Sequence, residues 1–154
     1  SPFYTFIRFQ DPAADRWARR LVRDALRYTD PILCAAGTLI AALKNASAFF
    51  STLHVRRRDH LPDAKPSAER VAEAVKRTLR EGELLYVATD GADERPFLRR
   101  LRERVGAPIR LLSDLPPLLR NSPGLAPAMH GMVEQVVCAH GHTFHGSLFS
   151  TFSA

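Results

Sequence analysis

The sequence turns from apolar to strongly basic within one segment, Ala46-Ser47-Ala48-Phe49-Phe50-Ser51-Thr52-Leu53-His54-Val55-Arg56-Arg57-Arg58-Asp59. Its apolar first half is typical of a buried strand, which we expect over residues 47–56. Pro62 and Pro66 follow and break regular structure. Three consecutive arginines at the end of a strand cannot all be buried without anionic partners, and a guanidinium can bind a phosphate or diphosphate through two hydrogen bonds. The segment therefore predicts either an anion site or a solvated charge cluster.

Helical and strand patterns alternate on both sides of this segment. We expect helices over residues 13–28, 31–44, 66–80, 93–105 and 128–140, and further strands over 83–90, 108–113 and 143–146. Asp30-Pro31 reads as an N-cap followed by proline at the first helical position. This alternation predicts an α/β fold, with a Rossmann-like, mostly parallel sheet flanked by helices. Such sheets bind ligands beyond the carboxyl ends of their strands, where residues 54–59, Thr89-Asp90 and 146–153 all fall.

Composition limits the classes of protein that this chain can be. At 154 residues and 45% hydrophobic content, we expect one globular domain over residues 1–154. The net charge of +6 would suit a polyanionic partner, but the arginines are spread along helical faces and few aromatics lie between them, so nucleic acid is not the expected ligand. No apolar run reaches transmembrane length and no signal peptide is visible. Cys34 and Cys138 could form one disulfide or be two buried thiols.

Two further features bear on the chemistry. We expect residues 146–153 to form a strand and then a tight turn into a helix, where Ser150 and Thr151 would offer an anion site or simply cap the helix. No pair of histidines has the spacing of a zinc motif with an acidic helper, and no DxD-type motif is present, so no bound metal is expected.

Four segments, taken in order, resemble those of one enzyme family. His54-Val55-Arg56-Arg57-Arg58-Asp59 matches H-x-R-R-x-D, and Leu85-Tyr86-Val87-Ala88-Thr89-Asp90 matches a strand ending in V-A-T-D. Met132-Val133-Glu134-Gln135-Val136-Val137-Cys138-Ala139-His140 is similar to a D-Q-x-x-C-A-H helix, and Phe144-His145-Gly146-Ser147-Leu148-Phe149-Ser150-Thr151-Phe152-Ser153 is similar to F-x-G-x-x-x-S-T-F-S. Together they resemble the GDP-fucose protein O-fucosyltransferase family, and its branch that modifies thrombospondin-type repeats most closely. Residues 16–44 are similar to the family's paired helices.

The resemblance implies the C-terminal, donor-binding half of a two-domain GT-B glycosyltransferase. It implies that Arg56 is the catalytic residue, which holds the donor diphosphate and supports the departing GDP. The GDP-fucose-binding residues that it implies are His54, Val55, Arg56, Glu134, Ser150, Thr151 and Phe152, with Glu134 on the guanosine. It also implies GDP-fucose as donor substrate without a metal or other cofactor, a protein acceptor with a Ser or Thr hydroxyl, and a location in the lumen of the endoplasmic reticulum or Golgi.

The chain departs from the family pattern in three ways. Glu134 stands where the family usually has Asp, and Arg58 replaces a smaller residue. The chain runs from Ser1 to Ala154, and we expect it to be a segment of a longer protein that lacks the acceptor-binding half and its catalytic base. We therefore expect this segment to be inactive alone. The alternatives are a glycan-directed fucosyltransferase, a non-catalytic nucleotide-binding relative and a basic nucleic-acid-binding domain.

Overall fold

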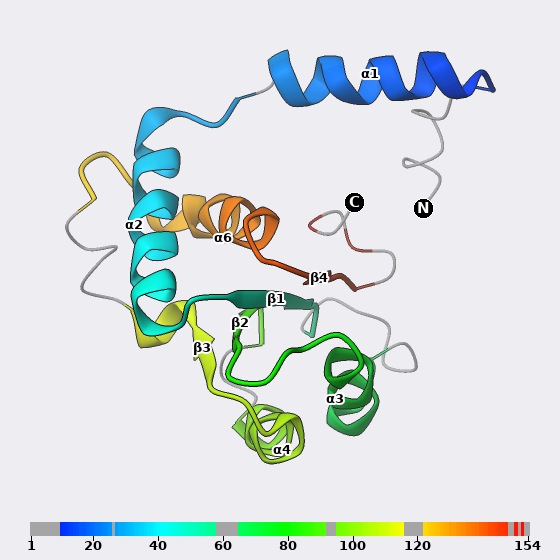
Figure 1. Cartoon of the computed structure of the whole chain (residues 1–154). Coiled ribbons are helices and arrows are strands. Elements are labelled where there is room, and N and C mark those ends of the chain that lie inside the picture. The colour runs from blue at the N-terminus through cyan, green and yellow to red at the C-terminus, as the bar shows by residue number, and fades with distance from the viewer. Residues whose placement is uncertain are drawn as a thin grey trace.

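A parallel sheet of four strands forms the centre of the molecule (Figure 1). The computed structural model describes residues 10–25, 27–57, 65–91, 95–115, 122–147, 150 and 152. The strands are β1 (Phe50–Val55), β2 (Leu84–Thr89), β3 (Ile109–Leu111) and β4 (Phe144–His145), in the order β3-β2-β1-β4. All three strand pairs are parallel, which confirms the predicted α/β class.

The strand register brings the ends of β1, β2 and β4 to one edge of the sheet. β1 pairs with β2 from Phe50↔Leu84 to Val55↔Thr89, whereas its pairing with β4 ends at Leu53↔His145. Since the strands are parallel, the chain leaves all of them at the same edge. The three segments that we expected at a ligand site therefore start from neighbouring strands.

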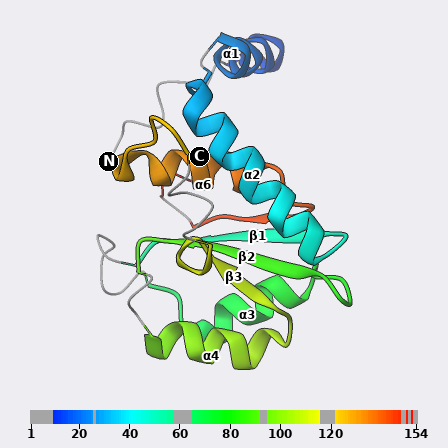
Figure 2. The ribbon, with the colours of Figure 1, turned by 90° about the vertical axis from the view of Figure 1, so that its left-hand side faces the viewer.

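Helices cover both faces of the sheet (Figure 2). α2 (Asp30–Ala46) and α6 (His130–Ala139) lie on one face, and α3 (Ala68–Lys76) and α4 (Arg95–Val105) on the other. Because side chains along β1 alternate between the two faces of the sheet, this strand contributes to both apolar clusters. Phe50 belongs to the cluster under α2 and α6, and Leu53 and Val55 belong to the cluster under α3 and α4. We call these the α2–α6 face and the α3–α4 face.

The helix and strand boundaries differ from the expected ones for local reasons. Thr29, not Asp30, occupies the N-cap position of α2, so the expected cap was wrong. The third helix begins at Ala68 because the hydroxyl of Ser67 accepts the Arg70 N–H, at 3.3 Å. β1 begins only at Phe50 because Ser47 still ends α2, donating its backbone N–H to the Leu43 carbonyl. A short 3₁₀ turn, η4 (Pro127–Met129), precedes α6, and another, η3 (Leu112–Asp114), follows β3.

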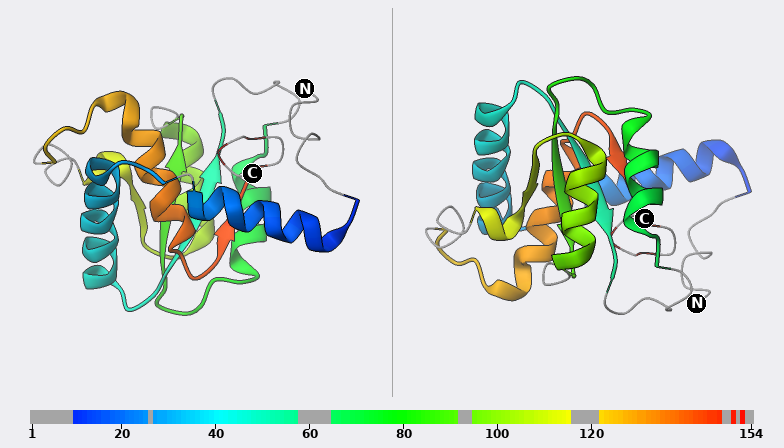
Figure 3. Two further views of the ribbon diagram at one scale, coloured as in Figure 1. Left: turned by 90° about the horizontal axis from the view of Figure 1, so that it is seen from above. Right: turned by 90° about the horizontal axis from the view of Figure 1, so that it is seen from below.

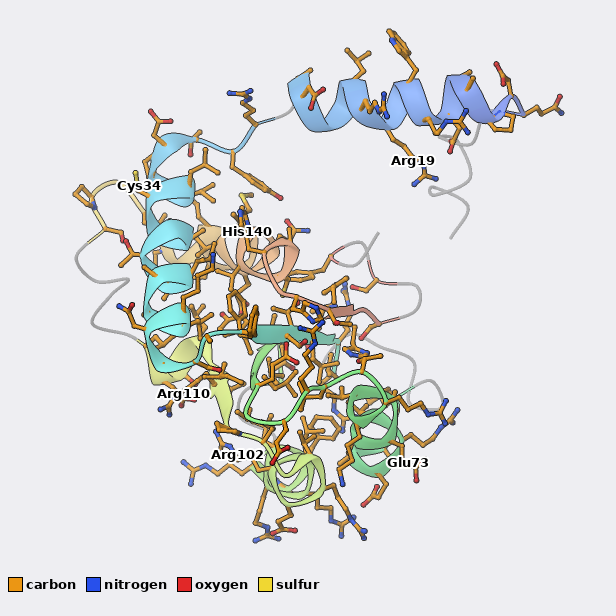
Figure 4. All side chains as sticks on the ribbon, in the orientation of Figure 1. Arg19, Cys34, Glu73, Arg102, Arg110 and His140 are labelled. Carbon is orange, nitrogen blue, oxygen red and sulfur yellow. The ribbon has the colours of Figure 1, made fainter. Side chains whose placement is uncertain are left out.

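α1 (Pro12–Ala25) lies apart from the sheet, beyond α2 and α6, in Figures 1 and 2, and it overlaps the sheet only when the molecule is seen from above or below (Figure 3). Its Trp17 and Leu21 side chains are exposed. Within the described part of the chain, no helix is long and apolar enough to cross a membrane. Both cysteines are free thiols: Cys34 is exposed on α2 (Figure 4), and Cys138 is buried on α6.

The turn between α6 and β4 requires glycine at position 141. A Cβ atom there would lie 2.6 Å from Cγ2 and 2.7 Å from Oγ1 of Thr52, which is fully buried and donates a 2.9 Å hydrogen bond to the Cys138 carbonyl. We expect Gly141→Ala to lower the free energy of unfolding by about 1–3 kcal/mol, measured by urea denaturation. Gly131→Ala is the control, because nothing lies within 4 Å of its added Cβ. Equal stability of the two variants would contradict this prediction.

Candidate functional site

The two described arginines at the end of β1 have different surroundings. The Arg57 guanidinium lies 4.2 Å from the centre of the Phe97 ring and donates from Nη1 to the Pro66 carbonyl at 3.1 Å. Phe97 belongs to the cluster of the α3–α4 face, so Arg57 points to the side that strand alternation predicts. Arg56 is half-buried and lines a pocket at the sheet edge. Arg57 therefore has a structural role, and Arg56 is placed to meet a ligand.

Side chains that follow the two neighbouring strands hold the backbone around Arg56. The Ser147 hydroxyl donates to the His54 carbonyl at 2.8 Å and accepts the Arg56 N–H at 3.1 Å. On the other side, Oδ1 of Asp90 accepts the Arg57 N–H at 2.6 Å. Ser147 follows β4, Asp90 follows β2 and Arg56 follows β1, so the segments after three strands meet here.

The pocket that Arg56 lines has a volume of about 610 Å³. Its lining also contains Lys65, Arg70, His145 and Ser147, and none of the described residues that line it is acidic. Three cations among the described lining residues favour an anionic ligand. Burial lowers the pKa of His145, so its imidazole is mostly neutral near pH 7.

Sequence reasoning missed Lys65 and Arg70. Lys65 lies in the sequence between Pro62 and Pro66, where no hydrophobic periodicity indicates its position. Arg70 lies in the first turn of α3, where the helix dipole disfavours a cation. The unusual position of a cation in the first turn of a helix, shortly after the arginine segment, is the signal that could have indicated Arg70.

The His54 ring lies on the α2–α6 face, where Phe152 packs, and His54 is also among the residues that line the pocket. Its ring stacks on that of Phe152, with centroids 4.0 Å apart and planes at 16°. Burial lowers its pKa to about 4, with Asp90 raising it and Arg56 lowering it further. His54 is therefore neutral at pH 7, and its partner Phe152 is held at its carbonyl by Nε2 of Gln135, at 3.4 Å.

Glu134 lies on the same face, on α6. Its Oε1 accepts a hydrogen bond from the hydroxyl of Tyr86 on β2, at 3.1 Å. Burial raises the pKa of Glu134 to about 7, although the bond from Tyr86 opposes the rise. Tyr86 is fully buried, and its pKa is raised by that burial first and by the Glu134 charge second. The acid is therefore near its titration point at neutral pH.

The remaining expected site residues are placed as follows. Ser150 is 4% exposed, its N–H donates to the Ser147 carbonyl at 3.3 Å, and its Oγ is buried without a hydrogen-bond partner in the described structure. A buried hydroxyl in this state is able to accept or donate to a ligand. Val55 lines the pocket, but its side chain is buried in the cluster of the α3–α4 face.

Part of the expected site lies outside the described residues, namely Thr151 together with Arg58 and Asp59 of the arginine segment. The expected helix after residue 146 falls partly there too. The described residues of that segment, at 146, 147, 150 and 152, are not helical.

The basic excess is otherwise dispersed over the surface (Figure 4). Arg19 on α1 pairs with Asp15 at 2.8 Å, and Arg102 on α4 lies 3.8 Å from Asp114. Arg110 on β3 is exposed. Among the described residues, no three His, Cys, Asp or Glu side chains are grouped so that they could hold a metal ion.

Comparison with known proteins identifies a family. The family model described as GDP-fucose protein O-fucosyltransferase matches residues 2–154, nearly the whole chain. No curated protein and no solved structure matches the chain significantly.

Proposed function

This chain belongs to the GDP-fucose protein O-fucosyltransferase family, and from that premise we propose that it binds GDP-fucose for transfer of fucose to Ser or Thr hydroxyls of a protein acceptor. One observation carries the proposal. Arg56 directly follows the buried strand β1, and Ser147 and Asp90 hold the backbone on either side of it. Arg56 also lines a pocket together with two further cations. This arrangement suits a diphosphate.

Arg56 would act on the leaving group. As the bond from the sugar C1 to the diphosphate oxygen breaks, negative charge grows on the β-phosphate of the departing GDP. A guanidinium fixed beside that oxygen stabilises the charge more in the transition state than in the bound donor. Lys65 and Arg70 in the same pocket add positive potential. Because these cations offset the diphosphate charge, we propose that donor binding needs no divalent metal.

The α2–α6 face would hold the nucleoside. His54 and Phe152 form a stacked pair that offers an aromatic surface, and His54 stays neutral because burial lowers its pKa to about 4. The Glu134 carboxylate would accept hydrogen bonds from N–H donors of the nucleoside. Ser150 adds a buried hydroxyl beside Ser147 that has no partner in the described structure.

The wider context of this donor site rests on family membership. We propose that the chain is the donor-binding half of a two-domain GT-B enzyme, that the base acting on the acceptor hydroxyl belongs to the acceptor-binding half, and that the enzyme works in the lumen of the secretory pathway. A non-catalytic relative would bind GDP-fucose equally well but would not transfer fucose to an acceptor.

Calorimetric titration of the chain with GDP tests the function and the metal independence together. We expect GDP and GDP-fucose to bind, and the affinity to change less than about twofold on addition of EDTA, because cations of the protein meet the diphosphate charge. A single-stranded oligonucleotide is the control ligand and should not displace GDP. Absence of GDP binding would overturn the proposed function, and a large loss of affinity in EDTA would indicate a metal-dependent donor site.

A further inference from the structure

Ser147 extends the attachment between β1 and β4 beyond the end of their pairing. The paired positions end at Leu53↔His145. Two residues later, the Ser147 hydroxyl donates to the His54 carbonyl at 2.8 Å and accepts the Arg56 N–H at 3.1 Å. One hydroxyl thus satisfies the two backbone groups that β4 no longer reaches.

These two hydrogen bonds hold the backbone on the amino-terminal side of the Arg56 Cα atom. The next peptide N–H, that of Arg57, is held by Asp90 at 2.6 Å. The backbone is therefore fixed on both sides of the Arg56 Cα, by a residue following β4 and a residue following β2. A long side chain loses less freedom on binding a ligand when the backbone that carries it is already fixed.

We propose that Ser147 is a positioning residue for Arg56: its hydroxyl fixes the backbone from which the guanidinium reaches a diphosphate in the 610 Å³ pocket. This inference rests on the proposed function. Ser147 would raise the affinity for phosphate-bearing ligands specifically, because it acts through Arg56 and not through the nucleoside.

The test combines Ser147→Ala with two ligands that differ only in the diphosphate. We expect Ser147→Ala to weaken GDP binding about tenfold and to leave guanosine binding unchanged, because displacing a charged contact by a fraction of an ångström costs binding at the phosphate alone. Ser147→Thr keeps a hydroxyl at the same place and should restore GDP affinity to within about threefold of the original chain.

Ser47 offers a matched control. Its hydroxyl also contacts two backbone groups beside β1, the carbonyls of Phe49 at 2.7 Å and Gly82 at 3.1 Å, but at the amino end of the strand. Ser47→Ala removes the same atom and should lower the melting temperature without changing GDP affinity. This comparison separates loss of stability from loss of positioning.

A double-mutant cycle decides whether the effect passes through Arg56. In an Arg56→Ala background, Ser147→Ala should cause no further loss of GDP affinity. A full additional loss, or equal losses for GDP and guanosine, would overturn the inference. If Ser147→Ala does not fold, Ser147→Cys, a weaker hydrogen-bonding group of similar shape, takes its place with the same expected pattern. Failure of the unaltered chain to bind GDP would instead overturn the proposed function itself.

Discussion

Replacing Arg56 by alanine should reduce the affinity of the chain for GDP by about thirty- to a thousandfold, equivalent to about 2–4 kcal/mol. The affinity for guanosine should stay the same. The reason is that Arg56 is half-buried in a positively charged pocket, where its contact with a phosphate is screened less than on an open surface. Calorimetric titration with both ligands measures the difference directly.

Arg57→Ala is the matched control for this prediction. It removes the same side chain one residue later, but the Arg57 guanidinium stacks on Phe97 and bonds to the Pro66 carbonyl. We therefore expect a lower melting temperature with GDP affinity within about threefold of the original. If Arg57→Ala weakened GDP binding more than Arg56→Ala, the assignment of Arg56 to the diphosphate would be wrong.

The sheet and the position of the arginine segment could be predicted because they follow from short-range patterns. An apolar run such as residues 84–88, buried throughout, is characteristic of a central parallel strand. A glycine also precedes each of the strands β2 and β3. Gly106 has a φ of 72° and directly follows α4, which explains why that helical pattern stops there. Gly82, with a φ of 75°, was expected to end the third helix, but α3 already ends at Lys76. Alternation past the end of β1 then predicts that Arg56 and Arg57 point to opposite sides.

The contacts that organise the site could not be predicted, because they join residues far apart in the chain. Ser147 and Arg56 are separated by 91 positions, and Tyr86 and Glu134 by 48. Ser147 follows a glycine and Tyr86 lies within a buried strand, but nothing in the sequence around either residue indicates its partner. Asp90 is similar: its position after a strand was evident, but its bond to the Arg57 N–H depends on the β1–β2 register.

The role of Glu134 shows how structure changes the interpretation of a sequence motif. The motif indicated an acid that contacts the nucleoside, with one more methylene than usual. The structure places that acid on α6, where it accepts a hydrogen bond from the buried Tyr86 and its pKa is raised to about 7 by burial. The longer side chain is thus held by a partner within the fold, and its charge depends on pH in the neutral range.

Substituting Glu134 by glutamine should therefore affect both binding and stability, in opposite directions. Burial raises the pKa of Glu134 from 4.5 to about 7, so the folded chain binds the proton more tightly than the unfolded chain does. Stability associated with this group is complete below pH 4.5 and is lost as the pH rises through 7. The ionised acid costs up to about 3 kcal/mol above pH 7. Glutamine stays neutral and can still accept the Tyr86 hydrogen bond, so Glu134→Gln should raise the free energy of unfolding at pH 8 and leave it unchanged at pH 4.

Binding should respond in the opposite sense. Only the carboxylate accepts two N–H donors of the nucleoside, so GDP affinity of the original chain should rise about tenfold between pH 6 and pH 8 relative to that of Glu134→Gln. The ratio cancels the titration of the phosphate itself, which both proteins share. His54 and Cys138 do not titrate in this range, because the pKa of His54 is lowered to about 4 and that of Cys138 is raised to about 12, both mainly by burial. If Glu134→Gln bound GDP as tightly as the original chain at pH 8 while unfolding at a different urea concentration, Glu134 would be a structural acid, and the nucleoside would be held by the His54–Phe152 pair without it.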